Sequence, residues 1–265
     1  MKTSQGEKPS LEGRRALVVG GSGGIGRAVS LELGARGAYV VVHGGSSREK
    51  LDSTLRELRL AREPELATPG LGAAGSEGFL LDLGDPASGL ARLSDALPGL
   101  GDIDILVVAF GPFVRKSLAA TDRADWERVA LLDLALPGTL CSACLPAMAS
   151  RGWGRILLFG GSRTDGIRAY SSNAAYAAAK TGLAVLVKSV AAEGAPRGVG
   201  CVLVCPGLTD TEYIGEAEKA ALRSRAPGGR LAEPAEIASA AVDLLVADPC
   251  LASGAIVTLD GGLSF

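Results

Sequence analysis

The sequence predicts an α/β fold, in which one domain is built on a doubly wound, parallel, seven-stranded sheet. Three observations lead to this prediction. Short apolar segments alternate with longer helical patterns along the 265 residues, a glycine-rich turn joins the first apolar segment to the first helical one, and no linker divides the chain. Apolar strands connected by helices are typical of parallel sheets that are covered on both faces.

The elements follow from this alternation in chain order. Strands are predicted at residues 17–19, 39–43, 79–82, 103–109, 155–159, 201–205 and 255–259. Helices are predicted at residues 27–33, 48–62, 86–97, 125–148, 174–193 and 234–247. Loops are predicted at residues 63–78, 163–172 and 209–229, the last with a short helix at 216–225. Loops at the carboxyl ends of strands build the ligand crevice in such sheets, so segment 209–229 is predicted as a mobile lid or a solvated loop.

Composition excludes several classes of function. The net charge of −2 suggests neither nucleic acid nor an anionic membrane as a partner. Residues 1–10 are predicted as a polar tail without a signal peptide, followed by a single domain at 11–265. The sequence contains no uninterrupted run of about 18 apolar residues, so no membrane span is predicted. We therefore expect a cytoplasmic protein with reduced cysteines.

Metal and thiol chemistry are also disfavoured. His43 is the single histidine, which argues against a zinc site, and no metal is predicted. Cys141 and Cys144 form a C-x-x-C pair, but they lie inside a helical pattern without a second pair of ligands. We therefore interpret both as buried small hydrophobic residues, and a thiol or metal enzyme is the weakest alternative.

A glycine-rich turn follows the first strand. Gly20, Gly24 and Gly26, with Ser22 and Ile25 between them, stand before a helical pattern. A strand, a glycine turn and a helix point free N–H groups and the positive end of a helix dipole at a phosphate. The turn is thus predicted to bind a dinucleotide, since glycine lets the backbone approach a pyrophosphate closely.

Tyr176 and Lys180 are predicted to carry the chemistry. They are four residues apart, so in a helix their side chains share one face. A neighbouring ammonium favours the phenolate and lowers the pKa of a tyrosine. Such a tyrosine can give a proton to a carbonyl oxygen or take one from an alcohol. This spacing alone is common on exposed helices. It points to catalysis here because the chain also contains the glycine-rich turn.

Taken together, these motifs resemble the classical short-chain dehydrogenase/reductases, whose fold is of the Rossmann type. The likeness runs from about residue 11 to residue 265. It is carried by the glycine turn, by Asp82-Leu83, by Tyr176-x-x-x-Lys180, by Cys205-Pro206-Gly207-Leu208-Thr209-Asp210-Thr211 and by Asp260-Gly261-Gly262. The 3-oxoacyl-carrier-protein reductases are the most similar type. Enoyl reductases of the family use a longer tyrosine–lysine spacing, which would need a tyrosine at Asn173.

The resemblance implies a role for each matching residue. Tyr176 would exchange the proton, and Lys180 would lower its pKa and bond the nicotinamide ribose. Ser162 would polarise the carbonyl, although a count forward from Gly154 places the family serine at Gly161. The further residues expected at the cofactor are Asp82, Leu83, Gly111, Pro206, Gly207, Thr209 and Thr211.

The chain departs from the family pattern at several positions. Val19 replaces a threonine before the first glycine. The Asn-Asn-Ala-Gly motif reads Val-Ala-Phe-Gly, so that Phe110 is expected to pack against the cofactor beside Gly111. Asp133 stands where the family has a relay asparagine, and its main-chain carbonyl is expected to keep that role. A carboxylate buried there needs a partner, so Asp133 is predicted to pair.

The residues after the second strand favour NADP(H) over NAD(H). The aligned position for the acid that NAD enzymes use is Gly44, while Ser46, Ser47 and Arg48 follow. These three are expected to bind a 2′-phosphate. The family's other basic marker is absent, since Gly23 precedes Gly24, and Arg48 alone also fits the first turn of a solvated helix.

The predicted function is the NADP(H)-dependent interconversion of a ketone and a secondary alcohol, with a small-molecule substrate. The resemblance and the long apolar helices imply a homotetramer or a homodimer. The leading alternative is a non-catalytic NADP(H)-binding regulatory protein, which Asp133 and the altered motif at Phe110 suggest. A sugar epimerase or dehydratase is disfavoured, because its larger carboxy-terminal region does not fit this length.

Overall fold

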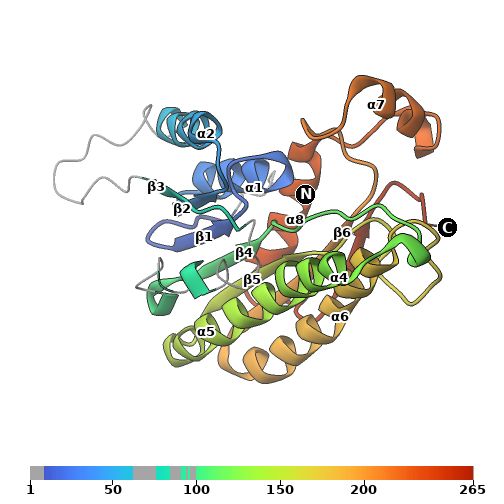
Figure 1. Ribbon diagram of the computed structural model, residues 1–265. Helices are drawn as coiled ribbons and strands as arrows, with labels where there is room; N and C mark the ends of the chain where they lie inside the picture. The colour runs from blue at the N-terminus through green and yellow to red at the C-terminus, as the bar shows by residue number, and fades with distance from the viewer. Residues whose placement is uncertain (1–8, 62–75, 84–90, 94, 96–99, 265) are drawn as a thin grey trace, which may run out of the picture.

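One parallel sheet organises the molecule (Figure 1). The computed structural model describes residues 9–61, 76–83, 91–93, 95 and 100–264. The strands are β1 (Arg15–Val19), β2 (Tyr39–Gly44), β3 (Glu77–Leu80), β4 (Ile105–Val108), β5 (Gly154–Phe159), β6 (Val199–Pro206) and β7 (Ile256–Leu259). Their order is β3-β2-β1-β4-β5-β6-β7, and each neighbouring pair is parallel. The predicted doubly wound fold with seven strands is confirmed.

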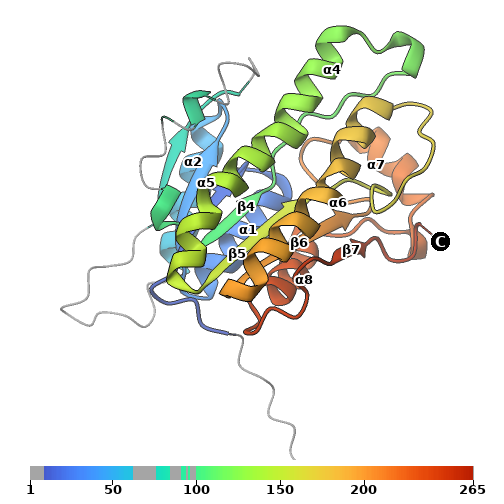
Figure 2. The ribbon, with the colours of Figure 1, turned by 90° about the horizontal axis from the view of Figure 1, so that it is seen from below.

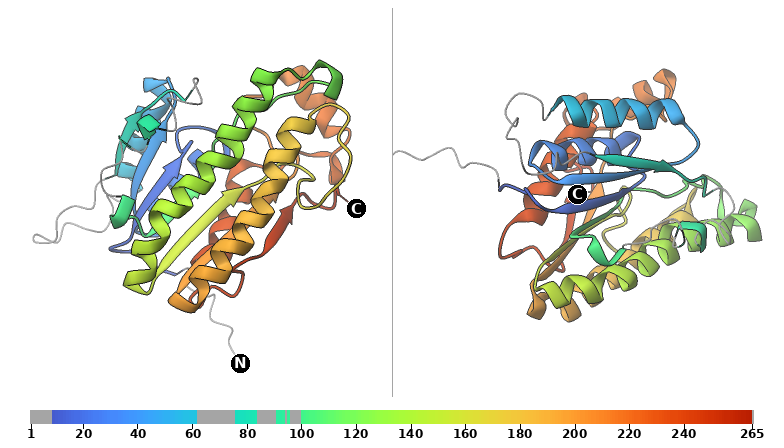
Figure 3. Two further views of the ribbon diagram at one scale, coloured as in Figure 1. Left: turned by 60° about the horizontal axis from the view of Figure 1, so that its bottom comes forward. Right: turned by 90° about the vertical axis from the view of Figure 1, so that its left-hand side faces the viewer.

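Helices cover both faces of this sheet, as the edge-on view in Figure 3 shows. On one face lie α1 (Gly24–Ala35), α2 (Arg48–Leu60) and α8 (Pro234–Val246). On the other lie α4 (Arg123–Val129), a π-helical turn (Ala130–Ala135), α5 (Leu136–Arg151) and α6 (Ala174–Gly194). The short α7 (Glu216–Arg223) stands apart from both layers (Figure 1). This arrangement buries the central strands on both sides, which is why they are mostly apolar.

Several predicted boundaries are corrected. The third strand begins at Glu77 rather than 79, so the end of the predicted loop 63–78 belongs to β3, and its residues 63–75 lie outside the described part. The first helix already begins at Gly24, within the glycine turn. The predicted helix 125–148 is longer and carries the π-helical turn in its middle. Of the predicted helix 86–97, only residues 91–93 and 95 are described, and they are helical.

The two longest helical stretches pack along the sheet. Residues 123–151 and 174–197 are long and apolar enough to cross a bilayer. In the structure they lie side by side on one face of the sheet (Figure 2), and Leu140, Met148 and Val187 enter its core. Their apolar character is accounted for in part by this packing, as expected for core helices.

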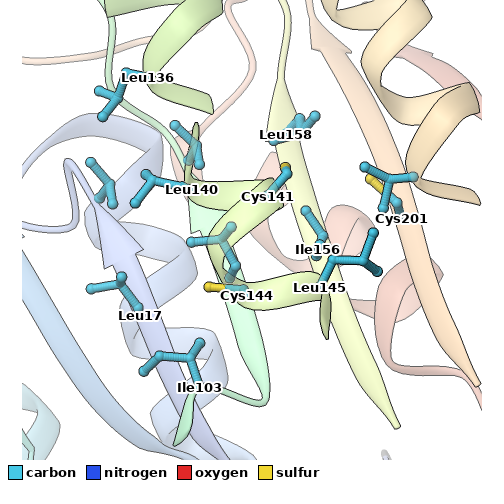
Figure 4. Close-up of a cluster of buried hydrophobic side chains, with 14 of the residues drawn as sticks. Leu17, Ile103, Leu136, Leu140, Cys141, Cys144, Leu145, Ile156, Leu158 and Cys201 are labelled. Atoms are coloured by element: carbon cyan, nitrogen blue, oxygen red, sulfur yellow. The ribbon is translucent and has the colours of Figure 1, made fainter. Parts of the chain in front are cut away.

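The C-x-x-C pair belongs to this core. Figure 4 shows Cys141 and Cys144 among Leu140, Leu145 and Ile156. Burial raises the pKa of both thiols to about 12, so neither is a thiolate near neutral pH. Their interpretation as small core residues agrees with this environment.

Candidate functional site

The carboxyl ends of β1, β4, β5 and β6 open into a cleft of about 950 Å³. Its wall brings together most of the predicted site: Gly20, Gly24, Ile25, Phe110, Gly111, Ser162, Tyr176, Lys180, Pro206, Gly207, Thr209 and Thr211. The other predicted residues lie around it. Ser22 faces away into a neighbouring groove, and Gly26 and Asp133 are buried behind the wall.

The glycine turn has the geometry that a phosphate needs. Gly20 and Gly24 have φ angles of 81° and 50°, a region that L side chains rarely adopt. A Cβ atom on Gly26 would overlap the carbonyl oxygen of Gly20, so α1 can approach β1 this closely only with glycine there. The backbone N–H of Gly24 donates to a carboxylate of the same protein, so this turn already binds an anion. A dinucleotide phosphate therefore fits the residues present.

His43 holds this turn in place, a role that the sequence reasoning missed. Its Nδ1 accepts a hydrogen bond from the N–H of Gly20 at 3.1 Å, and its Nε2 donates to the carbonyl of Leu81 at 2.9 Å. Burial lowers the pKa of His43, so the ring stays neutral and can accept at Nδ1. The ring of Phe110 lies edge-on to it, with centroids 6.2 Å apart. The single histidine is thus a positioning residue for the turn.

The residues at the ends of β2 and β3, which are predicted to bind the adenosine part of the cofactor, lie on one side of the glycine turn. Gly44 is buried, with Ser22 Oγ close to the place that a side chain would take. Ser46 and Arg48 are exposed, and Ser47 caps α2 by accepting from the N–H of Lys50. At the end of β3, Asp82 is exposed and Leu83 is buried.

The turn after β6 closes the cleft from the other side. A Cβ atom on Gly207 would lie 2.6 Å from the Cα atom of Asp260, so the predicted Pro-Gly turn and the chain after β7 touch at a glycine. Thr209 is buried and its hydroxyl donates to the carbonyl of Gly207 at 3.3 Å. The methyl group of Thr211 faces Gly24. The two ends of the predicted dinucleotide site are therefore neighbours.

Tyr176 and Lys180 come from one face of α6, as predicted. Lys180 Nζ lies 6.0 Å from the centre of the Tyr176 ring and donates to the carbonyl of Phe159 at 3.1 Å. The ring of Phe113 packs edge-on against Tyr176, with centroids 4.9 Å apart. Sequence reasoning did not find Phe113, because it lies beyond the family motif that ends at Gly111.

Asp133 forms the predicted pair, and its partner is Lys180. The π-helical turn places its carboxylate beneath the lysine, with Oδ1 3.1 Å from Nζ, and the Asp133 side chain is fully buried. Burial raises the pKa of Asp133 to about 6, although the charge of Lys180 opposes the rise. A Cβ atom on Gly111 would overlap this carboxylate, so a glycine at 111 gives it room.

The expected pKa shift of Tyr176 is wrong in direction. Burial, and next to it the charge of Asp133, raise the pKa of the phenol above its usual value. Lys180 Nζ forms an ion pair with Asp133 Oδ1 at 3.1 Å, whereas it lies 6.0 Å from the centre of the Tyr176 ring. In the protein without cofactor, the Tyr176 hydroxyl therefore stays protonated at neutral pH and can act as a hydrogen-bond donor.

Gly161 faces the phenol of Tyr176 from the turn after β5. A Cβ atom on Gly161 would lie 2.6 Å from Tyr176 Oη, so the residue that faces the phenol from this turn is Gly161. Ser162, one residue further on, lines the cleft but forms no hydrogen bond with Tyr176. A role for Ser162 at a bound carbonyl stays a prediction.

Comparison with known proteins identifies relatives of this arrangement. A family model described as Enoyl-(Acyl carrier protein) reductase matches residues 20–264. The chain is 32% identical over 257 residues to the 3-oxoacyl-(acyl-carrier-protein) reductase FabG of Salmonella typhimurium, covering 96% of this chain and 98% of the relative. FabG of Escherichia coli is also 32% identical with the same coverage.

Solved structures share the fold over nearly the whole chain. A putative gluconate dehydrogenase from Agrobacterium tumefaciens is 29% identical with a TM-score of 0.79, covering 96% of this chain and 97% of that one. A 3-oxoacyl (acyl-carrier-protein) reductase from the same organism, with NADP bound, is 27% identical with a TM-score of 0.77, covering 96% and 95%. With its glycine turn, Tyr176 and Lys180 around one cleft, the chain belongs to the classical short-chain dehydrogenase/reductase family of oxidoreductases and is similar to its 3-oxoacyl-carrier-protein reductases.

Proposed function

We propose that this protein uses NADPH to reduce the ketone group of a 3-oxoacyl-like small molecule to a secondary alcohol. The observation that carries the proposal is the position of Tyr176. Its side chain lines the cleft that also contains the glycine turn, and Lys180 lies on the same face of α6. A proton donor beside a dinucleotide site is what carbonyl reduction requires.

Tyr176 is in the protonation state that carbonyl reduction needs. Burial and the neighbouring Asp133 charge raise the pKa of Tyr176, so its hydroxyl is protonated at neutral pH. It can therefore give a proton from Oη to the carbonyl oxygen as negative charge develops there. The bound cofactor supplies the hydride. Lys180, held by Asp133 and by the carbonyl of Phe159, would hold the nicotinamide ribose.

The first experiment follows NADPH absorbance against a panel of ketones, with the Tyr176→Phe and Ser162→Ala variants. Loss of the hydroxyl at 176 should remove nearly all turnover, at least about a thousandfold, while NADPH affinity stays within about twofold. If Ser162 donates to the carbonyl oxygen, its alanine variant should lose about a hundredfold in kcat. A Tyr176→Phe variant that keeps its activity would contradict the proposal. An NADPH-binding wild type without turnover on any ketone would instead favour the regulatory alternative.

NADP(H) is proposed over NAD(H) because β2 ends without an acid. The N–H and hydroxyl groups at Ser46 and Ser47, together with the exposed guanidinium of Arg48, stand at the amino end of α2. They can bind a 2′-phosphate that an acid would repel. Two similar solved structures hold NADP. Titrating NADPH and NADH into the wild type and Arg48→Glu tests this preference, and equal affinities in the wild type would defeat it.

A further inference from the structure

The loop that follows β6 lies across the glycine turn. Both carboxylate oxygens of Glu212 are 3.2 Å from the backbone nitrogen of Gly24, the first residue of α1. Lys50 Nζ is 3.2 Å from Oε1 of the same carboxylate. A helix N-terminus and an ammonium are the two groups that bind phosphate in many proteins. In this chain they bind a carboxylate of the protein itself.

The neighbouring Tyr213 fixes the loop in this position. Its hydroxyl fills the space in front of Gly23, so that a Cβ atom at 23 would overlap it. Its ring also receives the ammonium of Lys50, which lies 4.6 Å from the ring centre. Glycine at 23 therefore makes room for Tyr213, whose ring lies against Lys50.

The electrostatics of Glu212 agree with a bound anion. Partial burial favours the protonated carboxyl, yet hydrogen bonds from backbone N–H groups and from Lys50 hold its pKa below the usual value. Glu212 is thus ionised at neutral pH. Its charge is placed where a phosphate of the dinucleotide would carry its own, and the two anions cannot share the Gly24 N–H.

We propose that Glu212 is an internal competitor for a cofactor phosphate, and that the displaced site consists of the Gly24 N–H and Lys50 Nζ. The inference rests on the proposed function and adds a regulation of the same site. The loop at residues 208–215 has to move off the turn before the dinucleotide can bind. Part of the binding free energy is spent on that displacement, so the observed affinity is lower than the intrinsic one.

The test is a titration of NADPH into the wild type and Glu212→Gln, followed by nucleotide fluorescence. The glutamine keeps the shape but removes the charge, so NADPH should bind about threefold to tenfold more tightly. Glu216→Gln is the matched control, because Glu216 directly follows the loop as the first residue of α7, is exposed and pairs with Lys219. Its affinity should equal that of the wild type. An unchanged or weaker affinity in Glu212→Gln overturns the proposal.

The role of Lys50 is tested in the Glu212→Gln background, where it no longer holds the carboxylate. Adding Lys50→Met should weaken NADPH binding about tenfold relative to Glu212→Gln alone, and salt should affect the affinity less. An equal affinity of the single and the double variant would remove Lys50 from the proposed site.

Inorganic pyrophosphate separates this inference from the proposed function. Its binding needs no nicotinamide chemistry, and it should raise the Tm of Glu212→Gln more than that of the wild type. If pyrophosphate shows this difference while NADPH binds to no variant, the competition by Glu212 stands and the proposed function fails. If pyrophosphate stabilises both proteins equally, the competition is refuted whatever the activity is.

Discussion

The ammonium of Lys180 lies between a carboxylate and a phenol, and this position controls the acidity of the site. Its Nζ forms an ion pair with Asp133 at 3.1 Å, whereas the ring centre of Tyr176 is 6.0 Å away. The pKa of Asp133 is about 6, so the carboxylate is ionised through the neutral range. There it pairs with the Lys180 ammonium, and its negative charge disfavours the tyrosinate.

Replacing Asp133 by asparagine should therefore acidify Tyr176. The negative charge that raises its pKa is removed, and Lys180 is left to favour the phenolate. Alcohol oxidation needs the phenolate as base, so the ascending, low-pH limb of its pH profile should move to lower pH by about one unit. The measurement is kcat/KM for oxidation as a function of pH.

Glu127→Gln is the control for this experiment, since Glu127 is exposed on α4 and pairs with Arg123. Its profile should follow the wild type. Superimposable profiles for Asp133→Asn and the wild type would show that Asp133 does not act on Tyr176.

At the scale of elements, the packing of α1 against β1 determines the shape of the predicted cofactor site. Gly26 lies against the carbonyl of Gly20, and the hydroxyl of Ser30 donates to the carbonyl of Gly26 at 3.0 Å. This contact fixes where the amino end of α1 points. The element therefore depends on one close approach of two backbone segments.

Gly26→Ala should push α1 away from β1. The added methyl group has no free volume, so the variant should lose about 1–3 kcal/mol of unfolding free energy and bind NADPH at least tenfold more weakly. Urea unfolding and a fluorescence titration measure the two effects. Gly45→Ala, where nothing lies within 4 Å of the added atom, is the control. A Gly26→Ala variant with normal binding would show that the turn tolerates a wider spacing.

The elements were predictable to different degrees for physical reasons. Apolar runs, glycine spacing and an i,i+4 pair are local signals. They predicted the strands, the glycine turn and the shared face of Tyr176 and Lys180, respectively. The contact of Glu212 with Gly24 joins residues 188 positions apart, and no local pattern predicts it. The raised pKa of Tyr176 also depends on burial, which the i,i+4 spacing alone does not reveal. The position of Gly161 opposite the phenol follows from the turn geometry after β5.

For the whole molecule, the outer side of α4, α5 and α6 suggests a subunit interface. Val185 is 71% exposed in the middle of α6, and Trp126 and Leu134 are 39% and 37% exposed on the adjoining helical stretch. We propose that this face joins copies of the chain into a homodimer or homotetramer. Apolar side chains gathered on one helical face are typical of such contacts.

Val185→Lys should then shift the protein to a smaller assembly, since a charge would be buried in the contact. Sedimentation velocity measures the change. Leu60→Lys is the control, because Leu60 is 59% exposed at the end of α2, on the opposite face of the sheet. A wild type that sediments as a monomer, or an unchanged assembly in Val185→Lys, would contradict the proposed interface.

The overlap between a side chain at Gly111 and the carboxylate of Asp133 has a consequence for how this lineage can change. An alanine at 111 is expected to be tolerated only after Asp133 has been replaced by a smaller residue. The order of the two replacements therefore matters, and related genes should show them as a correlated pair. Descendants that keep Asp133 are expected to keep glycine at position 111.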